Sequence, residues 1–174
     1  IHFPPDAAAL ARARERLIYE ELLVLQTGLL RLKSRGRGGG APAAPIDAVE
    51  EFWERLPFSP TGAQRRAVRE AAADMARTTP MNRLVQGDVG SGKTAVAAAL
   101  CWQAAKNGLQ AALMAPTELL ARQHFATLSG FFAGSDVKTA LLTGSTPKRE
   151  RAAVLAALAD GSVQVAVGTH ALLS

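Results

Sequence analysis

The sequence contains the stretch Gly87-Asp88-Val89-Gly90-Ser91-Gly92-Lys93-Thr94, which has the form G-x-x-x-x-G-K-T. An apolar run, residues 83–86, precedes it and reads as a short buried strand, and an alanine-rich segment, residues 95–106, reads as a helix. A glycine turn between strand and helix is typical of a phosphate-binding P-loop, because glycines let main-chain N–H groups face a polyphosphate at the helix N-terminus. A chance glycine loop is the alternative, and the flanking elements favour nucleotide binding over it.

Each residue type in this stretch has a use in holding a nucleoside triphosphate. Lys93 is expected to reach the β- and γ-phosphates, and the Thr94 hydroxyl is expected to be a ligand of Mg²⁺. The residues before them, 87–92, would surround the phosphates with N–H groups. The pattern therefore predicts a nucleotide and Mg²⁺ as cofactors.

Length, composition and charge limit the class of protein. The chain has 174 residues, is 48% hydrophobic and carries a net charge of +5. This length and apolar content allow one domain, or a domain with an appendage. The positive charge lies after residue 57, since the first 57 residues carry eight groups of each sign. An anionic partner such as nucleic acid and a plain solvated surface explain this excess equally well.

The cellular compartment is also suggested by composition. Cys101 is the single cysteine, so no internal disulfide can form, which fits a reduced cytoplasmic compartment. No apolar run approaches eighteen residues, and the first residues lack the layout of a signal peptide. We expect a soluble protein with no membrane partner.

A long helix is expected before the P-loop domain. Two prolines precede Asp6, which reads as the N-cap of a helix running to about Lys33. One apolar stripe runs along it, made of Leu10, Leu17, Leu22, Leu25, Leu29 and Leu32. The stripe is expected to dock on another domain, and a coiled-coil seam is the alternative. Residues 34–45 read as a linker, whose Arg35 and Arg37 could also touch phosphate. The expected domains are 1–45 and 46–174.

Gln64 admits two interpretations. Thr61 with Gln64 three residues later forms a capping box that opens a helix from Gly62 to about Ala76. A glutamine held there, with the aromatic Phe58 six residues before it, can also read an adenine edge through its paired donor and acceptor groups. The spacing alone does not separate these interpretations, and both can hold.

Strands and helices alternate after the P-loop helix. Apolar strands are expected at 110–115, 137–143 and 163–167, with helices at 117–132 and 146–158 between them. Together with the strand before the P-loop they make four strands of a parallel α/β sheet with right-handed crossovers.

Small polar residues follow three of these strands, where ligands of parallel sheets bind. They are Pro116 and Thr117, then Gly144 and Ser145, then Thr169. Their amides and hydroxyls could hold a nucleic-acid backbone. Ordinary loop chemistry uses the same residue types, and the residues alone slightly favour it.

The motifs together strongly resemble the RecG family of bacterial superfamily 2 DNA translocases. The resemblance is carried by residues 56–64, by Pro80-Met81-Asn82-Arg83-Leu84-Val85-Gln86 leading into the P-loop, and by Ala115-Pro116-Thr117-Glu118 and Leu142-Thr143-Gly144-Ser145. Val167-Gly168-Thr169-His170 resembles a further motif of the family. The transcription-repair coupling factor has a similar layout but usually carries phenylalanine where Ser91 stands.

The resemblance implies an ATP-driven helicase that remodels branched DNA, regressing stalled forks and migrating Holliday junctions in DNA repair and recombination. It implies that residues 46–174 belong to the first RecA-like motor domain, a three-layer α/β/α sandwich. ATP would be held by Phe58, Gln64 and the P-loop residues, with Mg²⁺ on Thr94. The three strand-end loops would contact DNA, which now favours their functional interpretation. A single-stranded-DNA-binding protein is a further expected partner, and the expected location is the bacterial cytoplasm at the nucleoid.

The sequence stops before any Asp-Glu-x-x box, and no acidic residue follows Asp160. Such carboxylates orient Mg²⁺ and water in this chemistry. We therefore expect the chain by itself to bind nucleotide weakly or not at all, and to hydrolyse it negligibly. Two other function classes stay open: a P-loop NTPase that does not act on DNA, and a non-catalytic interaction module that uses the leucine-striped helix.

Overall fold

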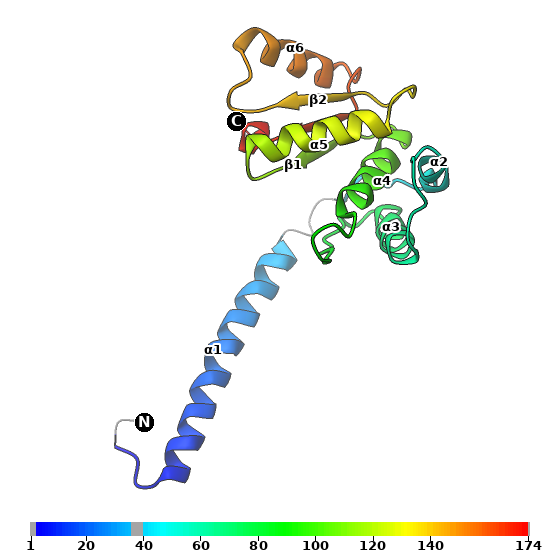
Figure 1. Ribbon diagram of the computed structural model, residues 1–174. Helices are drawn as coiled ribbons and strands as arrows, with labels where there is room; N and C mark the ends of the chain where they lie inside the picture. The colour runs from blue at the N-terminus through cyan, green and yellow to red at the C-terminus, as the bar shows by residue number, and fades with distance from the viewer. Residues whose placement is uncertain (1–2, 36–39, 174) are drawn as a thin grey trace. The chain divides into compact units, whose positions relative to one another are not determined.

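The computed structural model describes residues 3–35 and 40–173, and the chain divides into two compact units, Ile1–Gly40 and Ala41–Ser174 (Figure 1). In the first unit α1 (Ala7–Arg35) is one long helix. The Asp6 carboxylate caps it by accepting a hydrogen bond of 2.6 Å from the Ala9 N–H, as predicted. The glycine-rich part of the expected linker, with Arg37 and the side chain of Arg35, lies outside the described residues.

The second unit is built on a three-stranded parallel sheet in the order β1-β3-β2. Its strands are β1 (Ala111–Met114), β2 (Thr139–Leu142) and β3 (Val165–Gly168). The central strand β3 is buried along its whole length, as its Val-Ala-Val sequence suits for a strand covered on both faces. Helix α5 (Glu118–Phe131) packs on β2 and β3, and α6 (Lys148–Ala159) packs on β2 (Figure 1). The predicted parallel α/β fold is confirmed.

Three helices precede the sheet in the second unit. They are α2 (Val49–Glu54), α3 (Gly62–Met75) and α4 (Lys93–Lys106), and a 3₁₀ turn, η2 (His170–Leu173), follows β3. The alanines of α4 let α2, α3 and β1 approach it closely. Phe52 of α2 and Trp102 of α4 are fully buried with ring centroids 6.0 Å apart, so an aromatic core joins the two helices.

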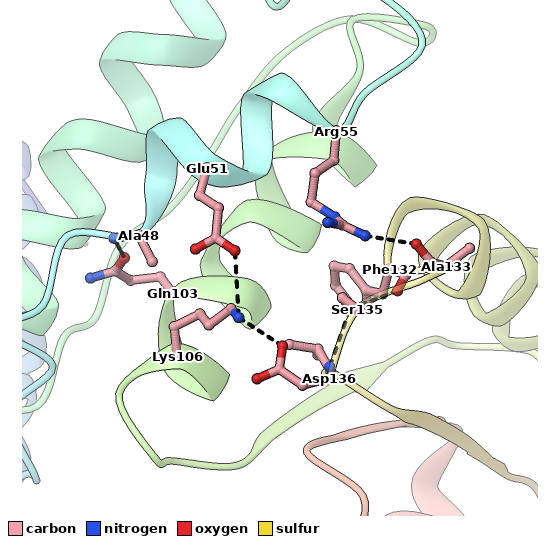
Figure 2. Close-up of polar contacts among 10 residues, drawn as sticks. Ala48, Glu51, Arg55, Gln103, Lys106, Phe132, Ala133, Ser135 and Asp136 are labelled. Carbon is pink, nitrogen blue, oxygen red and sulfur yellow. Dashed lines mark hydrogen bonds and ion pairs between the residues drawn. The ribbon is translucent and has the colours of Figure 1, made fainter.

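Helix α4 also holds the main chain that enters the second unit. The Gln103 side chain is 1% exposed, and its Oε1 accepts from the Ala48 N–H at 2.9 Å (Figure 2). Its Nε2 donates to the Ile46 carbonyl at 2.6 Å and the Ala44 carbonyl at 3.4 Å. The Asn107 amide pairs with both main-chain groups of Ile46. Residues 41–45, expected to belong to the linker, are therefore part of the compact unit.

Ion pairs extend this anchorage to the loop after α5. The Lys106 ammonium lies 2.7 Å from the Asp136 carboxylate and 3.5 Å from that of Glu51, as Figure 2 shows. The Arg55 guanidinium donates to the Ala133 carbonyl at 2.7 Å. Both cations also lie against the Trp102 ring, at 5.2 Å for Arg55 and 4.7 Å for Lys106.

The prediction of a buried strand at residues 83–86 was wrong. This segment does not form a strand, and Leu84 is 88% exposed. A strand exists only through ladder hydrogen bonds to a neighbour. Within the described part of the chain, β3 pairs with β1 and β2, and no ladder reaches residues 83–86. The described sheet thus has three strands in place of the four expected.

Candidate functional site

The P-loop is a tight turn that leads directly into α4. Gly90 and Gly92 have φ values of +81° and +79°, a backbone region that other residues adopt only under strain. The Ser91 N–H donates to the Asp88 carbonyl at 3.2 Å and closes the turn. Gly92 is the N-cap of α4, so the helix begins at Lys93 with its free N–H groups facing the loop.

Lys93 folds back into the loop that precedes it. Its ammonium donates to the carbonyls of Gly87 at 2.8 Å and Asp88 at 2.7 Å. A cation held at the mouth of the loop, beside the positive end of a helix, is a natural partner for a polyphosphate. Thr94 follows it in the first turn of α4 and is half-buried.

A side chain at either of two glycines of the loop would displace a neighbouring side chain. A Cβ on Gly87 would lie 2.7 Å from the Ser91 hydroxyl, and a Cβ on Gly92 would collide with the side-chain amide of Gln64. Asp88 and Val89, which are also predicted site residues, are exposed. A narrow loop of main-chain groups, one ammonium and one hydroxyl fits a Mg²⁺-nucleotide, with phosphates at the N–H groups and the metal at Thr94.

Gln64 forms the predicted capping box and also reaches the P-loop. Its Oε1 accepts from the Thr61 N–H at 2.8 Å, and its own N–H donates to the Thr61 hydroxyl at 3.2 Å. Its Nε2 donates to the Ser91 carbonyl at 2.9 Å. One amide hydrogen and one acceptor lone pair remain for an adenine edge. The structural interpretation of Gln64 is confirmed, and its role toward adenine stays a prediction.

Phe58 lies at the rim of a hollow close to the start of α3. It is 44% exposed and packs edge-on against Phe131, with ring centroids 6.1 Å apart. The hollow has a volume of about 460 Å³ and is lined by Glu50, Trp53, Glu54, Leu56, Pro57, Phe58, Ser59, Pro60 and Arg65. An exposed aromatic beside such a hollow can stack on a planar ring.

The sheet brings the three predicted strand-end loops to one edge. Met114 of β1 and Leu142 of β2 both lie opposite Gly168 of β3, so the three strands end in register. Beyond them the Ala115 N–H donates to the Gly168 carbonyl at 2.8 Å, and the Thr169 N–H donates to the Leu142 carbonyl at 3.4 Å. Pro116, Thr117, Gly144 and Ser145 are exposed there, and Thr169 is half-buried.

Two charged residues at this edge escaped the sequence analysis as site residues. The Glu118 carboxylate accepts 2.9 Å and 2.6 Å hydrogen bonds from the N–H and hydroxyl of Ser145. These bonds, the hydroxyl's first, lower the pKa of Glu118 below its ordinary value. The Arg122 guanidinium also donates to the Ser145 hydroxyl, at 3.3 Å. Two sequence signals could have pointed to Glu118: it directly follows Thr117, the N-cap of α5, and it stands in the Ala115-Pro116-Thr117-Glu118 stretch that carries the family resemblance.

The described residues add two negative findings. None of the helices described there is long and apolar enough to cross a membrane. Over the same residues, no group of three or more His, Cys, Asp or Glu side chains is arranged to hold a metal ion.

Comparison with known proteins identifies relatives of this fold and site. The DEAD/DEAH box helicase family matches residues 61–174. The ATP-dependent DNA helicase RecG of Synechocystis sp. is 44% identical over 99% of this chain, and that of Bacillus subtilis is also 44% identical over 99%. The chain spans 21% and 26% of the length of these two relatives.

Two solved structures are also similar. RecG bound to a three-way DNA junction superimposes with a TM-score of 0.86 at 44% identity, covering 98% of this chain and 24% of that one. A hypothetical ATP-dependent RNA helicase from Sulfolobus tokodaii gives a TM-score of 0.54 at 22% identity, over 72% of this chain and 34% of that one. At that identity the second likeness concerns the fold alone.

Proposed function

Because the chain belongs to the DEAD/DEAH box helicase family, we propose that it is part of an ATP-driven motor that moves on DNA and remodels branched structures. Regression of replication forks and migration of Holliday junctions, in DNA repair and recombination, are the proposed reactions of the whole protein. The observation that carries the proposal is the closed P-loop, in which the Lys93 ammonium donates to the Gly87 and Asp88 carbonyls and α4 begins directly after the Gly92 N-cap. The 44% identity to RecG over nearly the whole chain supports DNA as the substrate.

Residues 46–174 are proposed as the N-terminal part of the first motor domain, with residues 1–45 as the connector to it. Lys93 and the glycines of the loop would hold the ATP phosphates, and Thr94 would hold Mg²⁺. Bound Mg²⁺ would neutralise charge on the phosphate oxygens during phosphoryl transfer. Gln64, with Phe58 near it, would recognise adenine.

The strand-end loops are proposed to contact the DNA backbone. Main-chain N–H groups and hydroxyls at Thr117, Gly144, Ser145 and Thr169, together with the ring of Pro116, which has no N–H to donate, directly follow three neighbouring strands that end in register. Such groups bind phosphate without reading the base sequence, as a motor on duplex DNA requires. Forked DNA is the proposed partner, and a single-stranded-DNA-binding protein is a second one. A protein with this function would act at the bacterial nucleoid.

Nucleotide binding by the purified chain tests the first step of the proposal. A fluorescent ATP analogue with Mg²⁺ is titrated against the chain, Lys93→Ala and Lys138→Ala. Lys138 is exposed and serves as the matched control for the loss of one lysine. We expect the Lys93 variant to lose binding and the Lys138 variant to keep it. Equal binding by all three proteins, or binding by none, would contradict a functional P-loop in this chain.

A second candidate function rests on α1. Leu17, Leu22, Leu25, Leu29 and Leu32 are 46–65% exposed along this helix. Exposed apolar side chains in such number are typical of an interaction surface. If the chain is chiefly an interaction module, light scattering will show self-association that Leu22→Glu abolishes, and Lys93→Ala will change nothing that is measured.

A further inference from the structure

The loop between β2 and α6 has its hydrogen-bond donors already occupied. The N–H and the hydroxyl of Ser145 both point at the carboxylate of Glu118, with the distances given above. A Cβ on Gly144 would lie 3.3 Å from the same carboxylate, so this part of the loop also closes around Glu118. The carboxylate is thus held as a bound anion would be.

A DNA phosphate at this loop would need the same donors. A phosphate oxygen accepts hydrogen bonds from main-chain N–H and hydroxyl groups, as the Glu118 carboxylate does here. Each donated hydrogen serves one strong acceptor, and two anions at one point repel each other. Ser145 can therefore bind Glu118 or a phosphate, but not both through the same groups.

The loop does not depend on Glu118 for its shape. Thr143 is 1% exposed, and its N–H donates to the Thr146 hydroxyl at 2.9 Å, which closes the turn from within. The Thr146 N–H donates back to the Thr143 carbonyl at 3.2 Å. The donors of Ser145 would stay in place if the carboxylate left.

Glu118 has another partner within reach when it leaves. Arg122 lies four residues further along α5, one helical turn away, and its guanidinium already donates to the Ser145 hydroxyl at 3.3 Å. Glu118 is half-buried and Ser145 is exposed, so the exchange disturbs no core packing. Arg122 would then face both the carboxylate and an arriving phosphate.

We propose that Glu118 is an internal competitor of DNA phosphate, which occupies the donors of Ser145 until a DNA backbone displaces it. This inference rests on the proposed DNA contact at the strand-end loops. Glu118 would weaken the affinity of the strand-end loops for DNA phosphate. Binding of the DNA backbone would replace the Glu118 carboxylate by a phosphate on Ser145, and release would reverse this exchange.

The test compares Glu118→Gln with a matched loss of one negative charge. Glu15→Gln is the control, because Glu15 is an exposed residue of α1 that belongs to none of the proposed sites. Fluorescence anisotropy with a labelled DNA fork gives the affinity of the chain and of each variant. We expect Glu118→Gln to bind roughly two- to fivefold more tightly, the scale of one exposed charge interaction, and Glu15→Gln to bind like the parent. Adding Ser145→Ala to Glu118→Gln should remove part of the gain.

A second readout does not require DNA. In ¹H–¹⁵N spectra, inorganic phosphate should shift the Gly144 and Ser145 amide signals of Glu118→Gln and leave those of the parent chain unmoved. Such shifts without any DNA binding would keep the competitor role and overturn the DNA proposal. DNA binding that Glu118→Gln leaves equal or weaker, with no phosphate shift, would overturn the competitor role and keep the DNA proposal. Failure of both readouts would overturn both.

Discussion

The side-chain amide of Gln64 donates a hydrogen bond of 2.9 Å to the main-chain carbonyl of Ser91, which joins the start of α3 to the P-loop across 27 residues of sequence. The same side chain accepts from the Thr61 N–H and so caps its own helix. One residue therefore serves helix stability with its oxygen and loop geometry with its nitrogen.

Substitution can separate these two contributions. Gln64→Glu keeps an acceptor for Thr61 but places a carboxylate against the Ser91 carbonyl, whereas Gln64→Ala removes both contacts. We expect Gln64→Ala to lose about 1 kcal/mol of unfolding free energy, and Gln64→Glu to lose less. Both should bind an ATP analogue roughly fivefold more weakly, the scale of one lost hydrogen bond. Urea unfolding and nucleotide titration measure the two effects, and a Gln64→Glu variant with parental affinity would contradict the loop contact.

The two left-handed glycines of the P-loop offer a second comparison. Gly90 and Gly92 have nearly equal φ values, so alanine at either meets a similar backbone strain of about 1–2 kcal/mol. A Cβ at Gly90 meets nothing within 4 Å, while one at Gly92 collides with the Gln64 amide. Gly92→Ala should therefore reduce nucleotide affinity more than Gly90→Ala. Adding Gln64→Ala to each variant should reduce the difference in nucleotide affinity between Gly92→Ala and Gly90→Ala, because the colliding amide is then gone. If that difference stays the same, the collision is relieved by some other movement.

The sequence correctly predicted the features that depend on residues close together in the chain. The caps at Asp6 and Thr61 form the expected hydrogen bonds, because each involves residues three positions apart. The three strands that precede the polar loops also end at the same edge of the sheet, as expected for parallel strands of similar length. These features need no knowledge of distant partners.

Features that depend on distant residues were not predictable in this way. Residues 83–86 have the composition of a strand, but pairing decides whether a strand forms, and composition does not name the partner. Glu118 and Ser145 are separated by 27 residues, and Gln103 and Ala48 by 55, so no spacing rule connects them. The contacts that hold the site together are of this second kind.

The buried amide of Gln103 should be a major contributor to stability. Gln103→Leu would leave the buried Ala48 N–H and the buried Ala44 carbonyl without this partner, whereas the carbonyl of the exposed Ile46 would keep the Asn107 amide. We expect a loss of about 2–4 kcal/mol in unfolding free energy, because unsatisfied buried polar groups cost that much together. Gln123→Leu on the exposed surface of α5 is the control and should change stability by less than about 0.5 kcal/mol. If both variants lose a similarly small amount of unfolding free energy in urea, the hydrogen bonds of Gln103 to the main chain contribute little to stability.

The ion pair of Lys106 and Asp136 should give stability a specific dependence on pH. The hydrogen bond from the Lys106 ammonium, with its charge, holds the pKa of Asp136 below the ordinary value. A lowered folded pKa means that the stabilisation is complete above the unfolded pKa of about 3.9 and is lost as the pH falls through the folded value. Since the Asp136 side chain is 75% exposed, the whole effect should stay below about 1 kcal/mol.

Asp136→Asn isolates this contribution. Urea unfolding of the parent and the variant from pH 7 down to pH 2 should show a gap at neutral pH that closes below about pH 3.9. Glu118 and Asp160 also have lowered pKa values, but they contribute equally to both proteins. Their contributions therefore cancel in the difference in unfolding free energy between the parent and the variant. Molar salt should shrink the gap at pH 7, because the pair is open to solvent. A gap that persists unchanged to pH 2 would mean that Asp136 acts through packing or main-chain geometry and not through its charge.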